Sequence, residues 1–412
     1  MEGRGCPACS DMKQGIKALI SLKCFKTFRT FRIVLYDIRA VFTRLEKVVS
    51  EGRNVLSFFC GNRYILCRPC WRGMLEKGQL TTVAELIKNN ISMSSVDQYC
   101  EETGICKEDF KVIEPRSFQG EVFAIDGSNV VVYDWSVARL NKICAGYAVY
   151  RGTDWQRTVI PYDDVFLADP EGYMEQFEPY LKGIFRRENF ALKESDLDRL
   201  STYFRELHEY IALKEAIGEA RPGDLILYDG GFDVFEPLRG ILKGIIKDAE
   251  EKGVDLLGVS KSSAIYWGDG ISRPFVHHTG TAGSVFAPGA AWYISVKGKR
   301  VKPQPDWDGG ETFVTRFDGR SERAFRVDMP TYMVDRAGSA LGKLVLCSCS
   351  AECLGYPHAL FRAHRDIRIT DQEGAFLRLK LMDVLCEMGL GESKVRVLMQ
   401  DYHDVIEMRP GI

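Results

Sequence analysis

The sequence lacks the features of a membrane or secreted protein. Its 412 residues hold no run of 18 apolar residues, which a membrane-spanning helix needs, and no signal-peptide pattern. We therefore expect a cytoplasmic protein with no membrane partner. Internal repeats and low-complexity segments are also missing, and a hydrophobic content of 45% suits one large domain with one or two smaller ones.

A phosphate-binding loop of the ATPase type is missing as well. The pattern Gly338-x-x-x-Gly342-Lys343 is one residue too short and is followed by Leu344, where Ser or Thr is required. We therefore infer no ATPase activity.

The chain has almost no net charge, −2 over its full length, so no global charge marks it as a nucleic-acid binder. The distribution is uneven, because residues 1–78 hold 15 Lys and Arg against 6 Asp and Glu. A basic N-terminal region followed by an acidic remainder is suited to binding the phosphate backbone of a nucleic acid or an acidic protein partner. The alternative is a pair of helices with a solvated basic face.

Eight of the 13 cysteines lie before residue 107. Cys6-x-x-Cys9 and Cys67-x-x-Cys70 could together make a four-sulfur site for a structural Zn²⁺ ion. Their separation is much longer than that of a zinc ribbon. Reduced cysteines packed in a core are the interpretation that we favour.

Helical periodicity dominates the N-terminal region. Apolar residues recur at helical spacing over residues 12–50, and Thr82 with Glu85 makes a capping box before a second helix. Residues 95–118 are expected to form a connector. We therefore predict a basic, cysteine-rich, mainly helical region over 1–115 and a larger domain over 116–412.

From residue 121 the pattern changes to strands and then to strands alternating with helices. Residues 121–126, 129–135 and 142–151 predict an antiparallel meander, whereas 160–200 is expected to hold loops and short helices. The later elements expected are a helix over 196–217, a strand ending at Asp229, a helix over 238–251, strands over 256–259, 292–296, 312–317 and 324–327, a helix opened by Tyr356-Pro357, and a helix between Thr370 and Gly389. This order favours an α/β fold with a mixed sheet flanked by helices.

Two acids each end an apolar run and precede a glycine. Val122–Ile125 leads into Asp126, and Leu225–Tyr228 leads into Asp229. We interpret both as strands that end in an Asp-Gly turn at the edge of a sheet, where a metal ion can reach the carboxylates. Either Asp-Gly alone is typical of a hairpin turn. The pair favours a site in which two divalent ions about 4 Å apart hydrolyse a phosphodiester.

Other segments carry groups that suit the same chemistry. The helix before Asp229 offers Glu206, Glu209 and Glu215 as a third acid, although a surface glutamate is the default for each. Lys261 lies between hydroxyl residues just after a strand and can hold a phosphate, or it belongs to a simple turn. His364, one turn after Leu360, should face the protein body as a ligand or as a core histidine.

Taken in order, four short motifs resemble the NurA nuclease family over about residues 118–395. They are Ile125-Asp126-Gly127-Ser128, Leu227-Tyr228-Asp229-Gly230, Val259-Ser260-Lys261-Ser262, and Tyr356-Pro357 with Ala363-His364. The resemblance implies an RNase H-like core, Mn²⁺- or Mg²⁺-dependent DNA cleavage as a single-strand endonuclease and 5′-to-3′ exonuclease, and a homodimer. It also implies docking on a hexameric HerA-type ATPase that pumps DNA in the resection of double-strand breaks.

Carried over by position, the resemblance makes Asp126 and Asp229 metal ligands. It makes His364 a ligand or proton carrier, and it places Lys261 and Tyr356 at the scissile phosphate. Glu209 is our choice for the helix acid and a further metal ligand, with Glu206 next. The sequence departs from the family where Gly-Gly-Phe follows Asp229, and its cysteine-rich front is not shared.

Two other functions fit the same residues. A non-catalytic adaptor of the translocase complex would bind DNA through the basic front of the chain and cleave nothing. A metal-dependent phosphoesterase would act on small molecules with the same acids.

Overall fold

The computed structural model describes residues 77–91, 95–135, 138–186, 199–234, 236–268, 273–305, 307 and 309–399. The predicted helix over 12–50 and the pairs Cys6/Cys9 and Cys67/Cys70 lie outside these residues. The chain divides into two compact units. The unit over residues 1–93 and 267–273 contains helix α3 (Lys77–Ile91), which confirms a second helix in this region. The predicted start is wrong, because Thr82 and Glu85 lie inside the helix and form no capping box at its beginning. The predicted division after residue 115 stays a prediction.

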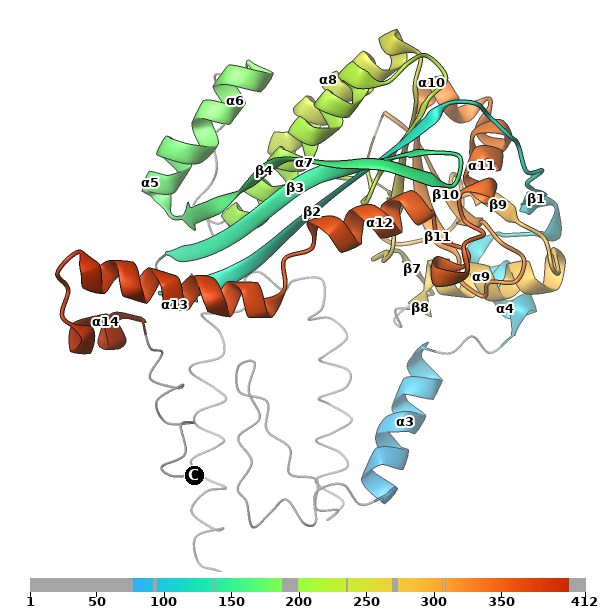
Figure 1. Cartoon of the computed structure of the whole chain (residues 1–412). Helices are drawn as coiled ribbons and strands as arrows, with labels where there is room; N and C mark the ends of the chain where they lie inside the picture. The colour runs from blue at the N-terminus through green and yellow to red at the C-terminus, as the bar shows by residue number, and fades with distance from the viewer. Residues whose placement is uncertain are drawn as a thin grey trace, which may run out of the picture. The chain divides into compact units, whose positions relative to one another are not determined.

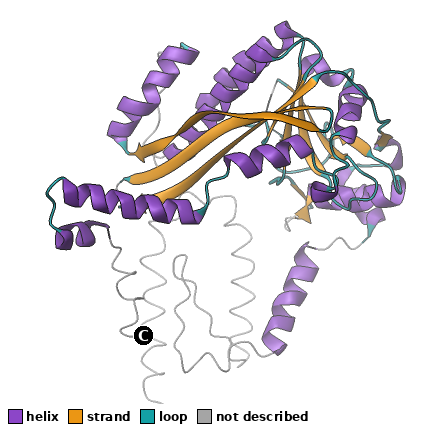
Figure 2. Cartoon of the chain, viewed as in Figure 1, coloured by secondary structure: helices purple, strands orange, loops and turns teal. Residues whose placement is uncertain are grey.

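The second unit, residues 94–266 and 274–412, is built on a nine-stranded mixed sheet (Figures 1 and 2). The strand order is β1-β9-β10-β11-β6-β5-β2-β3-β4. The strands are β1 (Lys111–Val112), β2 (Glu121–Asp134), β3 (Arg139–Arg151), β4 (Asp154–Ala168), β5 (Leu225–Tyr228), β6 (Asp255–Ser260), β9 (Trp292–Ser295), β10 (Gly310–Arg316) and β11 (Phe325–Pro330). Strands β7 (Tyr266–Trp267) and β8 (Arg273–Pro274) form a separate two-stranded ladder.

The central part of this sheet has the RNase H-like arrangement. Strand β2 is antiparallel to β3 and parallel to β5, and β5 is parallel to β6. The order β4-β3-β2-β5-β6 therefore joins an antiparallel meander to two parallel crossovers. The predicted α/β fold, a mixed sheet flanked by helices, is confirmed.

Helices cover both faces of the sheet (Figure 1). Helices α7 and α8 pack with the short helix α6 against one face, and α10, α11 and α12 pack against the other. The helices are α4 (Val96–Thr103), α5 (Pro170–Gly172), α6 (Glu178–Phe185), α7 (Leu200–Glu219), α8 (Glu236–Lys252), α9 (Phe275–Phe286), α10 (Thr331–Val334), α11 (Ala337–Leu346), α12 (His358–Ile367), α13 (Asp371–Glu387) and α14 (Glu392–Met399). In the part of the chain that is described, no helix combines the length and apolar character needed to cross a membrane.

Alternation along β2 assigns its residues to the two faces. Phe123 and Ile125 pack in the core with α7, whereas Val122 and Ala124 pack in the core with α12. Because successive strand residues point to opposite faces, Asp126 belongs to the α12 face and Gly127 to the α7 face. We refer to these as the α12 face and the α7 face below.

One prediction about β2 is wrong. The strand does not end at Asp126, because Gly127 pairs with Ala145 and the ladder with β3 continues to Asp134. The only irregularity is a bulge between Val131 and Tyr133. Strand pairing thus keeps the Asp-Gly sequence extended, and no turn forms there.

Two stretches hold more structure than the sequence predicted. Strand β4 occupies residues 154–168, where loops were expected from residue 160, and it is an edge strand with both faces partly exposed. It therefore lacks the apolar alternation of a buried strand, and an edge position tolerates Pro161. The expected connector over 95–118 contains helix α4 and edge strand β1.

The long helices agree with the sequence. Helix α7 matches the helix expected over 196–217, and α8 matches the one over 238–251. Helix α13 begins with the predicted capping box, in which Thr370 and Glu373 each accept a backbone N–H of the other. Gly389, beyond its end, has a φ of 93°, a conformation that favours glycine.

Candidate metal centre

Asp126 and Asp229 lie side by side on neighbouring strands. Ile125 of β2 is the partner of Tyr228 in the parallel ladder with β5, and each acid is the next residue along its strand. The backbone N–H of Asp229 donates to the carbonyl oxygen of Ile125 at 3.0 Å. Since Leu225 and Leu227 pack on the α12 face, alternation puts Asp229 on that face as well.

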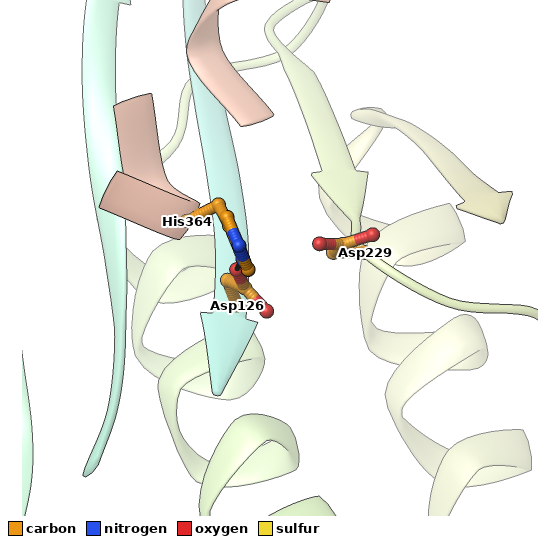
Figure 3. Close-up of side chains that lie close together, drawn as sticks. All are labelled: Asp126, Asp229 and His364. Carbon is orange, nitrogen blue, oxygen red and sulfur yellow. Dashed lines mark hydrogen bonds and ion pairs between the residues drawn. The ribbon is translucent and has the colours of Figure 1, made fainter. Parts of the chain in front are cut away.

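Helix α12 adds a histidine to the two acids. The His364 Nδ1 atom lies 2.9 Å from Asp126 Oδ2, and Figure 3 shows both side chains turned to the space beside Asp229. One ligand atom from each of these three residues lies within 4.8 Å of the others. Among the described residues, this is the one group of three that could hold a metal ion.

The amphipathic character of α12 holds His364 in this position. Ala359, Leu360 and Ala363 are fully buried on the α12 face, and small alanines let the helix approach the strands closely. The backbone N–H of Ile369, just after the helix, donates to Ser128 Oγ at 2.9 Å. The prediction that His364 faces the protein body holds only for its contact with Asp126, because 48% of its side chain is exposed and the site opens to solvent.

Lys261 and Tyr356 surround the second acid. Lys261 Nζ forms an ion pair with Asp229 Oδ2 at 2.5 Å, and the Tyr356 hydroxyl donates a weak hydrogen bond to Asp229 Oδ1 at 3.4 Å. The ammonium group also lies 5.7 Å from the centre of the Tyr356 ring. The structure therefore brings these two predicted residues to the same site as Asp126, Asp229 and His364.

The electrostatics of the acids suit a cation. The pKa of Asp229 is raised to about 6, mainly by burial and also by the Asp126 carboxylate, against the opposing effect of Lys261. Burial and the charge of Asp229 also raise the pKa of Tyr356. Two hard carboxylate oxygens and one imidazole nitrogen, held together by rigid elements, fit a divalent ion such as Mn²⁺.

Glu209 does not join this group. Its side chain is 1% exposed, and one oxygen pairs with Arg205 while the other accepts the Tyr228 hydroxyl at 2.8 Å. It lies on the α7 face against Gly127, where a Cβ would come within 2.3 Å of Glu209 Oε1. The role of Glu209 as a metal ligand stays a prediction, as does that of Glu206.

Burial also dominates the pKa of these glutamates. It raises the pKa of Glu209 to about 8, with Arg205 lowering it and Asp126 raising it. The pKa of Glu206 is raised by burial, again against Arg205, whose Nη2 lies 4.0 Å from Glu206 Oε1. The Asp126 carboxylate is therefore close enough to raise the pKa of Glu209, although the two side chains belong to opposite faces of the sheet.

The sequence reasoning missed three residues that support the site. Arg205 lies four positions before Glu209, one turn earlier on the same helix. Opposite charges at this spacing predict an ion pair, so the sequence alone could have revealed the role of Arg205. Tyr228 precedes Asp229 and therefore points to the opposite face, towards Glu209. The contact between Ser128 and Ile369 joins segments 241 positions apart, and no local signal reveals it.

Comparisons with known proteins give no family. No family model matches the sequence. Interferon beta-3 of Bos taurus is 26% identical over 123 residues, which are 30% of this chain and 61% of the relative. The chain thus spans less than two thirds of the curated relative that it matches.

Three solved structures align with this chain at low identity. The NurA nuclease from Sulfolobus solfataricus aligns with a TM-score of 0.46 and 16% identity, over 79% of this chain and 99% of that chain. The catalytic domain of human endonuclease V has a TM-score of 0.30 and 12% identity, over 62% and 87% of the two chains. Ciona intestinalis endonuclease V in complex with DNA has the same TM-score and identity, over 71% and 98%. At these TM-scores the likeness assigns no activity to this chain.

Proposed function

We propose that the chain is a divalent-metal-dependent DNA nuclease in which Asp126, Asp229 and His364 hold the ion. The observation that carries the proposal is the convergence of their three ligand atoms within 4.8 Å on one face of the sheet. Two carboxylates suit Mg²⁺ or Mn²⁺, and the imidazole nitrogen favours Mn²⁺. A bound ion would supply a Lewis acid that stabilises charge on a phosphoryl oxygen.

The surrounding side chains suit the handling of a phosphodiester. Lys261 is 39% exposed and carries its ammonium group at Asp229, so it can neutralise a phosphate that enters the site from solvent. The Tyr356 hydroxyl lies next to the Asp229 carboxylate, where it can contact a phosphate oxygen that approaches the ion. As the alternative to a ligand role, His364, which contacts Asp126 and is partly exposed, suits a group that moves a proton between the site and water.

The choice of DNA as substrate is supported by two features of the sequence. The four motifs that resemble the NurA family occur in the same order, and the first 78 residues carry a net positive charge that suits phosphate backbones. On the same basis we propose single-strand endonuclease and 5′-to-3′ exonuclease activity in the resection of double-strand breaks. A homodimer bound to a HerA-type hexameric ATPase belongs to this proposal and is tested by the mass of the complex in solution.

A cleavage assay tests the proposal directly. Linear single- and double-stranded DNA is incubated with Mn²⁺, with Mg²⁺ and with chelator, and we expect cutting only with a divalent ion. Asp126→Asn should keep the fold, as judged by circular dichroism, and abolish cleavage. Asp134→Asn is the matched control, since Asp134 lies on the same strand in an exposed ion pair with Arg139.

Three results would reject the assignment. Cleavage by Asp126→Asn at the wild-type rate would show that the site lies elsewhere. DNA binding with no metal-dependent cleavage would indicate the adaptor instead. A small phosphate ester could also inhibit DNA cleavage and be hydrolysed faster than DNA. That result would indicate a phosphoesterase that acts on small molecules.

A further inference from the structure

Edge strand β4 carries an exposed aromatic ring beside helix α12. Trp155 is 46% exposed, and its backbone pairs with Tyr150 of β3. Because Tyr150 packs in the core on the α12 face, Trp155 belongs to that face as well. It therefore lies on the same side of the sheet as Asp126, Asp229 and His364.

A closed cycle of contacts fixes the orientation of this ring. The indole N–H of Trp155 donates to Thr158 Oγ1 at 3.1 Å, and the Thr158 hydroxyl donates to Asp366 Oδ2 at 2.6 Å. Arg362 Nε donates to the same carboxylate oxygen at 2.6 Å. The guanidinium carbon of Arg362 lies 4.4 Å from the centre of the Trp155 ring, which completes the cycle between β4 and α12.

A β-bulge makes the cycle possible. The register between β3 and β4 shifts at Gln156, which is an extra residue without a partner in β3. In a regular strand, two residues three positions apart point to opposite faces of the sheet. With the bulge, Trp155 and Thr158 both point to α12.

The exposed part of Trp155 is free to stack on a planar ligand. Arg362 covers one face of the ring and Thr158 binds its N–H edge, so the exposed area belongs to the opposite face and the outer edge. Because the ring is already held in place, stacking costs little further conformational entropy. Exposed aromatic rings of this kind bind the bases of single-stranded nucleic acids.

Helix α12 adds positive charge beside the ring. Residues 358–368 contain one carboxylate, that of Asp366. The arginines of the same segment are Arg362, Arg365 and Arg368. Arg365 and Arg368 are exposed, and Arg365 is a neighbour of Arg362 on the helix surface because it lies three positions later. This surface is complementary to the phosphates of a nucleic acid strand.

The ring and the metal centre lie on opposite sides of α12. His364 contacts Asp126, whereas Arg362, two positions earlier, contacts Trp155. Two positions on a helix are more than half a turn apart, so these side chains leave the helix in opposite directions. The helix packs on β2, β3 and β4, and it therefore lies between the ring and the candidate metal ligands (Figure 1).

The separation of the ring from the site suits a strand and not a mononucleotide. Gly146 of β3 is the partner of Asp126, and Tyr150, the partner of Trp155, lies four residues further along β3. Trp155 is therefore displaced from Asp126 by about 14 Å along the strands and about 10 Å across them. A ligand that reaches both must extend over several nucleotides.

We propose that the outer face of Trp155 stacks on an unpaired base of single-stranded DNA, and that the phosphates of the same strand pass over α12 at Arg365 towards the metal centre. The inference rests on the proposed nuclease function and adds to it a site that selects single strands. A base inside a duplex is paired and stacked on its neighbours, so it cannot stack on Trp155 unless it is first extruded.

Binding to single strands and to duplexes, measured in chelator on the full chain, tests the proposal. The ligands are an oligothymidine and a duplex of the same length. Trp155→Ala should weaken single-strand binding by about 5- to 150-fold, the range for loss of one stacked base, and change duplex binding by less than about threefold. Trp155→Phe keeps an aromatic surface, so it should retain single-strand binding within about threefold of wild type.

Phe376→Ala is the matched control. Phe376 of α13 is 56% exposed, and the ammonium group of Lys380 lies 4.7 Å from its ring centre. This variant should leave both affinities unchanged. Equal losses for single strands and duplexes in Trp155→Ala, or no loss, would overturn the proposal. A loss in Trp155→Phe as large as that in Trp155→Ala would also overturn it, because the indole N–H would then be the group responsible.

Tryptophan fluorescence decides the question if Trp155→Ala does not fold. The chain has six tryptophans, and stacking on a base quenches the indole that takes part. Oligothymidine should quench part of the wild-type emission, and Trp155→Phe should lack that part. Quenching of equal size in the two proteins would overturn the proposal.

The outcome is separate from that of the cleavage assay. A selective loss of single-strand binding in Trp155→Ala, with no metal-dependent cleavage by wild type, would retain the stacking site and reject the nuclease. Metal-dependent cleavage with single-strand binding that does not depend on Trp155 would reject the stacking site and retain the nuclease.

Discussion

Asp126 and Asp229 are level with each other on adjacent parallel strands, one residue beyond the paired residues Ile125 and Tyr228. The spacing of the two carboxylates is therefore set by backbone hydrogen bonds, including the one from the Asp229 N–H to Ile125. Two acids held in this way repel each other in the absence of a cation, which contributes to the raised pKa of Asp229. The fold thus maintains an arrangement that a cation stabilises.

Lys261→Met should change metal affinity and cleavage in opposite directions. Lys261 forms an ion pair with Asp229 and so competes with an incoming metal ion for that carboxylate. We expect Mn²⁺ to bind about three- to tenfold more tightly, and cleavage to fall by more than about tenfold because the phosphate loses its cation. Calorimetry and a cleavage assay measure the two effects.

Lys297→Met is the control for this variant, since Lys297 pairs with Glu311 on an exposed part of the sheet. It should leave both quantities unchanged. If Lys261→Met weakened both Mn²⁺ binding and cleavage, the competition between Lys261 and the ion would be disproved.

Arg365 and Arg368 should contact the phosphate backbone of DNA. Both are exposed, at the end of helix α12 that carries His364. Replacing either with alanine should reduce the slope of log affinity against log salt by about 0.9 for duplex DNA, the value for one lost phosphate contact. Binding is measured in chelator, so that cleavage does not interfere.

Arg396→Ala, on α14 and paired with Glu392, is the matched control and should leave the salt slope unchanged. If the Arg365 and Arg368 variants had the same salt dependence of DNA affinity as wild type, DNA would not contact this end of α12.

Gly127→Ala should destabilise the protein. A Cβ at this position would lie 2.3 Å from Glu209 Oε1 and 2.7 Å from its Cγ, so the Glu209 side chain must leave its partners Arg205 and Tyr228, or α7 or β2 must shift. We expect a loss of about 1 to 3 kcal/mol in the free energy of unfolding, measured with urea. At Gly218 of α7 a Cβ meets nothing within 4 Å, so Gly218→Ala should be neutral or stabilise by up to about 1 kcal/mol. Equal effects of the two substitutions would contradict this packing.

His208 should make the fold sensitive to acid. This residue of α7 is 1% exposed and stacks on Tyr162 with ring centres 3.5 Å apart, and burial lowers its pKa to about 3. Between about pH 6.5 and pH 3 the unfolded chain binds a proton there that the folded chain does not. The free energy of unfolding therefore falls as the pH drops through this window.

The variant His208→Phe removes this proton uptake and should keep the aromatic stacking. Between pH 7 and pH 4.5, wild type should lose about 2 to 3 kcal/mol more stability than the variant. Urea unfolding of both proteins at the two pH values measures the difference. Parallel losses would show that His208 is not the group responsible.

The sequence predicted where the candidate site lies but not how strand β2 passes through it. Asp126 and Asp229 could be paired because each follows an apolar run, and their proximity is confirmed by the structure. The turn at Gly127 was wrong because strand extension depends on pairing with β3, a partner that local composition does not reveal. Edge strand β4 was missed because solvent on both faces removes the apolar alternation.

Glu209 illustrates the same limit at the level of a side chain. The sequence placed it correctly on the helix before Asp229. The default of a surface glutamate was wrong, because Glu209 is buried. Which sheet residue it meets depends on how α7 packs across β2, and that follows from long-range contacts. The metal-ligand role of Glu209 remains a prediction.

The continuous ladder between β2 and β3 restricts how the chain length can vary around Asp126. Deleting one residue from β2 before Asp126 would turn the acid over to α7, away from His364, while every backbone hydrogen bond could re-form. Deleting two would keep it on the correct side and move it along the strand by about 7 Å, out of step with Asp229. Insertions and deletions in this hairpin should therefore be tolerated only beyond the site, towards the bulge at Val131.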